Sequence, residues 1–192
     1  MTDLKREFLV LRKAIVRYVF CLFAVFSGLL VLPLESSSYA GRLFLSAKNS
    51  LVPEGIPVVA TGPVSAFVAP IVTAFLVAIL ATFPLGIFFL IRFLRPALRR
   101  EERRTLSSFV LPSLILFYGG CALAYFLIIP TTFRVLYGFS APMGVEAFFA
   151  LDDFISSVFF LTVSVGLAFL PPVVMIVLSR IGVVPGPFWL RH

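Results

Sequence analysis

Four long apolar runs, separated by charged segments, form the main pattern along this 192-residue chain. Lys, Arg, Asp and Glu are all absent from Tyr18–Leu34, Gly55–Ile91, Thr105–Phe133 and Phe154–Ser179. A helix needs about 17–25 predominantly apolar residues to cross the hydrocarbon core of a bilayer, so each run is long enough for one span. We therefore predict an all-α, polytopic transmembrane protein in a single membrane domain, residues 1–192. Its spans are expected at about residues 18–36, 65–92, 105–133 and 154–179.

Prolines within the runs predict that the spans are long and bent. Pro70 and Pro84 lie in the second run, and the pair Pro171-Pro172 lies in the last third of the fourth. Proline removes a helix N–H group and crowds the preceding turn, which kinks a helix. The second run is too long for one span and too short for two. We expect an interfacial approach before its span begins near Ser65, and bent helices that together form a concave wall.

The segment before the first span has its own periodicity. Leu4, Phe8, Leu11 and Ile15 recur every three or four residues between basic side chains. This spacing is typical of an amphipathic helix, so residues 2–17 are expected to lie along the membrane interface. A cleaved signal peptide is the alternative, but the apolar stretch is longer than usual for one and the cleavage motif is weak.

Composition supports the membrane assignment. The chain is 60% hydrophobic and 13% charged, and a soluble domain of this size would expose too much apolar surface. The net charge of +7 would suit nucleic acid, but the basic residues are divided among separate loops. Thirteen of the sixteen Lys and Arg residues fall on one side of four spans. Since basic loops stay in the cytoplasm, we predict a multi-pass plasma-membrane protein with no nucleic-acid partner, whose termini and loop 93–104 are cytoplasmic.

Catalytic and cofactor motifs are absent from the sequence. Its single histidine is His192, and Cys21 and Cys121 both lie within apolar runs, where buried free thiols are the expectation. Metal-ligand spacings and glycine-rich phosphate loops are also missing. We predict that the protein is not an enzyme and binds no cofactor.

A small-solute transporter is disfavoured because the four apolar runs contain no Lys, Arg, Asp, Glu or His, and such residues are the usual mark of an intramembrane functional site. Four hydroxyl side chains lie at depth, and we expect them to bond to carbonyls of their own helices. They are Thr73, Thr82, Thr162 and Ser164.

The acidic residues at the membrane surfaces allow two interpretations. Glu101 and Glu102 stand among four arginines. They either neutralise this turn locally or offer a carboxylate to an arginine-rich peptide, because a carboxylate matches the guanidinium fork. Asp152 and Asp153 precede the fourth span, where helix capping and the helix dipole explain them.

The hairpin sequence Phe93-Leu-Arg-Pro-Ala-Leu-Arg-Arg-Glu-Glu-Arg-Arg104 resembles the first cytoplasmic loop of the TatC family, the multispanning subunit of the twin-arginine protein translocase. In that family the loop reads Phe-x-x-Pro-Ala-Leu-x-x-x-Glu-[Arg/Lys]-Arg. Further similarity covers nearly the whole chain in one register. It includes the segments 8–13, 116–130, 166–174 and 181–183.

This resemblance implies a receptor for twin-arginine signal peptides. With single-span TatA/TatB-type partners in an oligomeric complex, such a protein would export folded cargo by using the proton gradient. Glu102 falls on the family's loop glutamate, beside Glu101. The other positions implied at the signal-peptide site are Phe93, Pro96, Leu98, Leu11, Arg12 and Glu7.

Two family glutamates are replaced in this sequence. Val10 occupies the glutamate position of the N-terminal signature, where Glu7, one helical turn earlier, is a partial substitute. Leu170 occupies the glutamate position of the fourth span. The family has six spans, and this sequence ends where the loop before the fifth would begin. The alternative function is therefore a shortened TatC-like membrane protein with a structural or lost translocation role.

Overall fold

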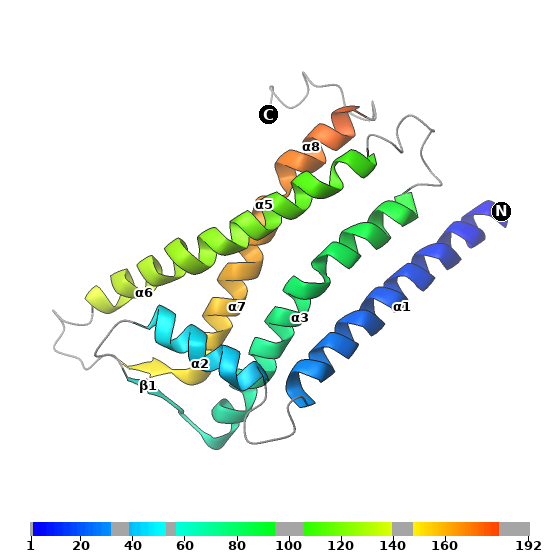
Figure 1. Ribbon diagram of the computed structural model, residues 1–192. Coiled ribbons are helices and arrows are strands. Elements are labelled where there is room, and N and C mark those ends of the chain that lie inside the picture. The colour runs from blue at the N-terminus through cyan, green and yellow to red at the C-terminus, as the bar shows by residue number, and fades with distance from the viewer. Residues whose placement is uncertain (1, 32–38, 53–56, 95–105, 140–147, 181–192) are drawn as a thin grey trace.

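The computed structural model describes residues 2–31, 39–52, 57–94, 106–139 and 148–180. Helices dominate these residues, and four helical stretches are long and apolar enough to cross a membrane: Arg12–Val31, Pro63–Arg92, Leu106–Leu136 and Leu151–Arg180. The predicted all-α, four-span fold class is confirmed. The elements are α1 (Thr2–Val31), α2 (Tyr39–Leu51), β1 (Val58–Val59), α3 (Pro63–Leu94), α5 (Val110–Leu123), the π-helix η2 (Ala124–Ile128), α6 (Ile129–Gly138), β2 (Phe149–Ala150), α7 (Leu151–Ala168) and α8 (Pro171–Arg180) (Figure 1).

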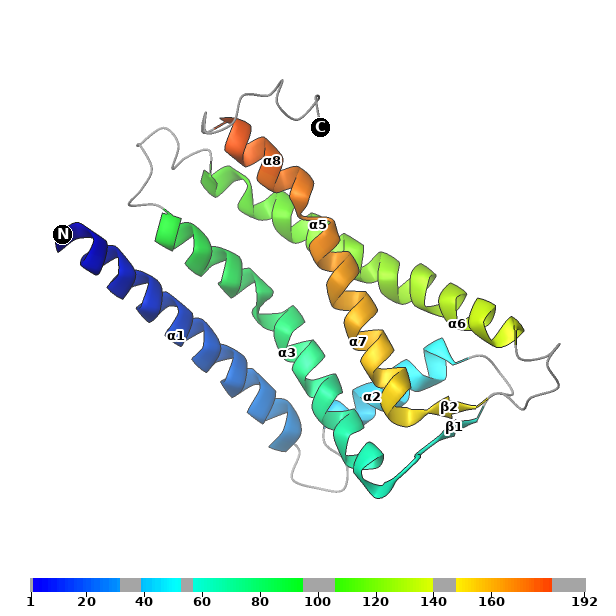
Figure 2. The ribbon, with the colours of Figure 1, turned by 180° about the vertical axis from the view of Figure 1, so that it is seen from behind.

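The N-terminal helix α1 differs from the expectation. It runs without interruption from Thr2 to Val31, so the prediction of a separate interfacial helix at residues 2–17 is wrong. The physical reason is that neither glycine nor proline occurs before Gly28 to stop the helix. Helix α1 packs along α3, and the two lie side by side in the views of Figures 1 and 2.

Helix α2 is an element that the hydropathy pattern did not predict. Its buried residues Ala40, Phe44 and Leu51 recur at spacings of four and seven, and the helix packs against α3. This is an amphipathic helix too short to span a bilayer, so it contains no long apolar run that would have predicted it.

Helix α3 continues through both Pro70 and Pro84, and at Pro84 a side chain replaces the missing backbone hydrogen bond. Pro84 has no N–H group to offer the carbonyl of Leu80, its partner in a regular helix. Tyr118 of α5 donates its hydroxyl to that carbonyl at 2.7 Å. The kink-prone position in α3 is therefore also a point of attachment to α5.

The hydroxyl groups at depth follow the prediction in two cases. Thr73 and Thr82 donate to the carbonyls of Ala69 and Ala78, at 2.8 and 2.7 Å. Thr162 contradicts the prediction: its buried hydroxyl has no hydrogen-bond partner in the described part of the chain.

The third and fourth spans deviate from regular helix where prolines require it. In η2 the N–H group of Ile129 donates to the carbonyl of Ala124, five residues back, immediately before Pro130. The fourth span breaks between α7 and α8, ahead of Pro171 and Pro172. Both breaks occur where proline removes the N–H groups of a regular α-helix.

The end of the molecule opposite the C-terminal ends of α3 and α8 holds a packed aromatic core (Figure 1). Phe133 and Phe154 lie 4.7 and 5.6 Å from Phe149 between ring centroids. The strands β1 and β2 form a short parallel pair beside it, with Val58 opposite Phe149 (Figure 2). This end of the molecule is therefore the tightly packed one.

The acids at the start of α7 occupy its first turn and do not cap it. The N-cap residue is Ala150, which makes no side-chain hydrogen bond, so the predicted capping by an aspartate is wrong. Asp152 instead accepts a hydrogen bond from Thr61 at 3.2 Å. Both aspartates still lie where the positive end of the helix dipole favours a carboxylate.

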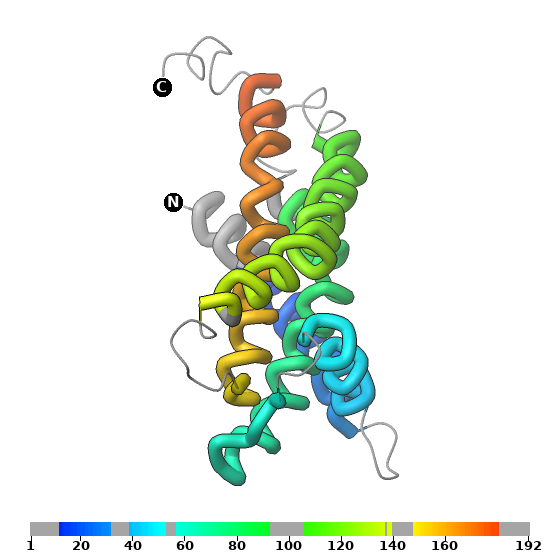
Figure 3. The backbone as a smooth tube through the Cα atoms, turned by 90° about the vertical axis from the view of Figure 1, so that its left-hand side faces the viewer, coloured from blue at the N-terminus to red at the C-terminus, as the bar shows by residue number. Residues whose placement is uncertain are grey.

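Helix α7 crosses the α5–α6 stretch at two glycines (Figure 3). A Cβ atom on Gly120 would lie 3.1 Å from the Cα atom of Gly166. Beside them, Cys121 donates its thiol to the carbonyl of Thr162 at 3.6 Å. Small residues at this crossing let the backbones approach, as in other membrane helix pairs. Cys21 and Cys121 are both free thiols, as predicted, but only Cys121 is buried, and Cys21 is half-buried on α1.

Candidate functional site

The residues predicted to bind a signal peptide converge, as far as they are described, on one end of the molecule. The first turns of α1 and the last turn of α3 lie at this end, together with the start of α5 and the end of α8 (Figures 1 and 2). Arg12 is exposed on α1. Glu7, Leu11 and Phe93 are placed by their backbones on α1 and α3. Four further predicted residues lie outside the described part: Pro96, Leu98, Glu101 and Glu102.

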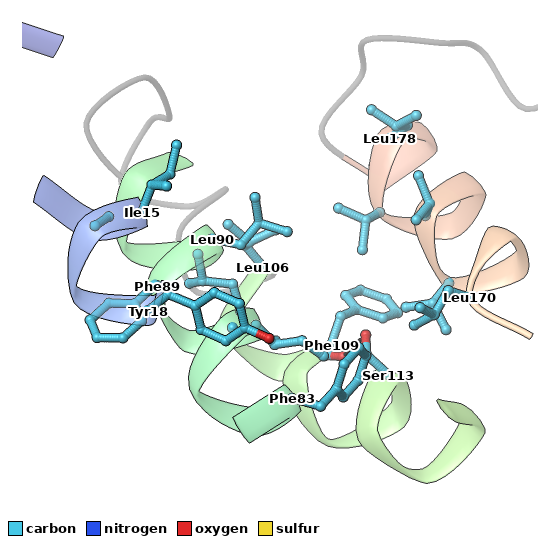
Figure 4. A pocket seen from close by; sticks show the side chains of 17 residues that line it. Ile15, Tyr18, Phe83, Phe89, Leu90, Leu106, Phe109, Ser113, Leu170 and Leu178 are labelled. Atoms are coloured by element: carbon cyan, nitrogen blue, oxygen red, sulfur yellow. Dashed lines mark hydrogen bonds between the residues drawn. The ribbon is translucent and has the colours of Figure 1, made fainter. Parts of the chain in front are cut away.

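An apolar groove of about 640 Å³ opens between four helices at this end (Figure 4). Ile15 of α1, Leu90 of α3 and Leu178 of α8 contribute to its walls, and Phe109 contributes from the turn before α5. Tyr18 and Ser113 are its lining residues with polar side chains, and Ser113 is engaged with the carbonyl of Phe109 at 2.7 Å. The groove therefore suits an apolar ligand.

Two contacts fix the distances between the walls. A Cβ atom on Gly86 of α3 would lie 3.1 Å from the ring of Tyr18, so glycine at this position lets α1 approach α3 closely. Phe83 of α3 stacks on Phe117 of α5 with ring centroids 3.4 Å apart. The floor of the groove is consequently held by aromatic packing that does not depend on a ligand.

Leu170 points into the groove from the break between α7 and α8 (Figure 4). Its carbonyl accepts the N–H groups of Val173 and Val174 at 3.0 and 3.1 Å, which starts the new helix. This is the position where the family resemblance implies a glutamate. With leucine there, the described lining of the groove carries no side chain that is charged at neutral pH.

Basic side chains surround this end of the molecule. The guanidinium carbon of Arg180 lies 5.9 Å from the ring centroid of Phe109, which itself lines the groove. Arg92 on α3 and Lys13 and Arg17 on α1 are exposed nearby. The sequence analysis did not predict the contact between Arg180 and Phe109, because the two residues are far apart in the chain. The signal that was available is that Phe109 lies near the start of the third apolar run and Arg180 directly follows the fourth, both at the basic side.

Comparison with known proteins shows the family. The family model of the Sec-independent protein translocase protein (TatC) matches residues 7–192. This chain belongs to the TatC family. The resemblance inferred from the hairpin sequence is thereby confirmed, and the match includes Phe93–Arg104.

Individual relatives agree with this membership. A TatC of Cenarchaeum symbiosum is 36% identical over 145 residues, which cover 76% of this chain and 55% of the relative. The TatC of Escherichia coli (strain K12) is 33% identical over 132 residues, covering 69% of this chain and 51% of the relative. The chain thus spans about half the length of these curated TatC relatives.

A crystal structure of the twin arginine translocase receptor TatC has the same fold. It superposes with a TM-score of 0.80 at 23% identity, over 93% of this chain and 76% of that one. At this identity the likeness concerns the fold alone. TatC membership and the four apolar stretches establish a multi-pass membrane protein of a translocase family.

Proposed function

We propose that this chain acts as a TatC-type subunit of the twin-arginine translocase. It is a receptor for twin-arginine signal peptides and the core of the complex that exports folded proteins by means of the proton gradient. The family match over residues 7–192 carries this proposal. The alternative of a purely structural, shortened relative is less well supported, because the match extends through the whole arginine-rich hairpin.

The proposed peptide site is the hairpin together with the N-terminal half of α1. Glu102 would pair with the arginines of the peptide, with Glu101, Phe93, Pro96 and Leu98 as its neighbours on the hairpin. The placement of α1 and the end of α3 at one end of the molecule supports a shared site with Glu7, Leu11 and Arg12 (Figure 2).

The proposed partners are single-span TatA/TatB-type membrane proteins in an oligomeric complex. Leu170 offers an arriving helix no carboxylate, so docking along this face depends on close packing.

The test of receptor function is peptide binding. A fluorescent signal peptide with two arginines should bind the purified chain in lipid nanodiscs about tenfold more tightly than the same peptide with two lysines. Arginine binds a carboxylate through two parallel hydrogen bonds, whereas lysine acts as a point charge, and a tenfold ratio corresponds to about 1.4 kcal/mol. Fluorescence anisotropy measures both affinities, and equal affinities would contradict twin-arginine recognition.

Membrane orientation is tested by labelling. In a chain whose Cys21 and Cys121 are changed to alanine, a cysteine at Asn49, exposed on α2, should react with an impermeant maleimide added outside the cell. A cysteine at Ala97 should react only after the membrane is opened, because basic loops remain cytoplasmic. Labelling of position 97 in intact cells would overturn the proposed orientation, with both termini in the cytoplasm.

A further inference from the structure

We propose that the groove between α1, α3, α5 and α8 binds an anionic phospholipid. One acyl chain would fill the groove, and the phosphate would lie at its mouth beside Arg180. This inference rests on the groove and its charges, and does not depend on signal-peptide recognition.

The walls of the groove match a hydrocarbon chain. Its lining is aliphatic and aromatic, and the volume of about 640 Å³ is in the usual range for small-molecule sites. Of its two hydroxyl groups, that of Ser113 is already bonded to the backbone. Nothing in the described lining could satisfy a buried ion, so the occupant within the groove is apolar.

The mouth of the groove matches a phosphate. Arg180 is exposed at the end of α8, and its guanidinium lies over the ring of Phe109, which lines the groove. Arg92, Lys13 and Arg17 are exposed at the same end. Asp152 and Asp153 belong to the opposite end of the molecule (Figure 1), whereas Asp3 and Glu7 lie on the first turns of α1, at the same end as the groove. Basic pockets between transmembrane helices on the cytoplasmic side are typical sites for anionic lipid headgroups.

Charge distinguishes this ligand from a signal peptide. Seven basic residues of the described helices lie on the N-terminal half of α1 or at the ends of α3 and α8: Lys5, Arg6, Arg12, Lys13, Arg17, Arg92 and Arg180. Only Asp3 and Glu7 of α1 oppose them among the described residues of these segments, so this end has an excess of positive charge. Such a mouth attracts a phosphate and repels the paired arginines of a peptide. The groove therefore favours a lipid, and the carboxylates that suit an arginine pair belong to the hairpin.

Native mass spectrometry of the whole chain in detergent tests the proposal. Phosphatidylglycerol and phosphatidylcholine with identical acyl chains are added separately, and bound lipid is measured for each. Phosphatidylglycerol should bind about fivefold more tightly, since a basic residue near an anionic lipid contributes about 1 kcal/mol. Equal binding of the two lipids would overturn the proposal, as would displacement of the lipid by inorganic phosphate.

Two variants with matched controls locate the site. Arg180→Gln should remove the preference for phosphatidylglycerol, whereas Arg134→Gln, exposed on α6 at the other end, should retain it. Val174→Trp should lower the binding of both lipids, because Val174 lines the groove. Ile176→Trp is its control on the same helix: Ile176 is 48% exposed against 51% for Val174 and does not line the groove.

The remaining outcomes are also decisive. Equal effects within either pair of variants would show that lipid binds elsewhere on the surface. If a twin-arginine peptide displaces the lipid and itself loses binding in Val174→Trp, the groove is a peptide site and the proposal is wrong. Retention of the lipid in a chain that binds no signal peptide would contradict the proposed receptor function while supporting the lipid site.

Discussion

Gly166→Ala is expected to lower the free energy of unfolding by about 1–3 kcal/mol, the usual cost of overpacking a filled interior. Gly166 lies where α7 crosses α5, and a Cβ atom there would lie 2.5 Å from the sulfur of Cys121 and 3.0 Å from the ring of Phe117. Both contacts are too short for carbon, so α5 and α7 would have to separate. In an unobstructed helix the same substitution stabilises by about 0.5–1 kcal/mol, and here the overlap outweighs that gain.

Gly119→Ala is the matched control for this effect. Gly119 lies on the outer side of α5, and a Cβ atom there would meet nothing within 4 Å. Its substitution should leave stability unchanged or raise it slightly. Reversible unfolding in mixed micelles, followed by circular dichroism, gives the free energy of unfolding for each variant.

The cause of the loss can be isolated with a second substitution. Cys121→Ala removes the sulfur that a methyl group at position 166 would meet first, so Gly166→Ala should cost less in that background. Phe117 remains, and the rescue should therefore be partial. Equal costs in both backgrounds would show that the crossing does not depend on this contact, and a Gly119→Ala loss of the same size would reject the packing argument altogether.

The fold class and the four spans could be predicted because they depend on uninterrupted apolar runs. No charge interrupts Tyr18–Leu34 or Phe154–Ser179. A single apolar run of this length crosses a bilayer as a helix, because the helix satisfies all of its own backbone hydrogen bonds. The pair Pro171-Pro172 likewise indicated where the fourth span breaks, although α3 continues through Pro70 and Pro84. What the runs could not predict was α2, whose buried face consists of only a few residues.

The groove could not be predicted from hydropathy, because it depends on which faces of four helices meet. Tyr18, Phe109 and Leu170 are spread over most of the chain, and each is an ordinary apolar or aromatic residue of its own segment. The prediction for Thr162 was wrong for the same reason. A threonine within a span usually bonds to its own helix, but the hydroxyl of Thr162 is buried at the α5–α7 crossing without a described partner. These features are set by tertiary packing, which a single sequence shows poorly.

Glu102→Gln is expected to weaken the binding of a twin-arginine signal peptide by about ten- to hundredfold. A hydrogen bond to a charged partner contributes about 1.5–3 kcal/mol, and the amide removes the charge while keeping the size of the side chain. Glu102 falls on the glutamate of the family loop, and the family match includes it. Anisotropy titration of the peptide with the chain in nanodiscs measures the change.

The charged neighbours of Glu102 provide control substitutions for this prediction. Arg99, Arg100, Arg103 and Arg104 repel the same peptide, so the hypothesis requires the hairpin to direct them away and present Glu102 toward α1. Under that arrangement Glu101→Gln, with an identical change in charge, should have little effect. The twin-lysine peptide should also lose much less affinity in Glu102→Gln, since lysine gains less from paired hydrogen bonds. If both substitutions weaken both peptides equally, the two glutamates act only as general negative charge, and the assignment of Glu102 as the arginine acceptor is wrong.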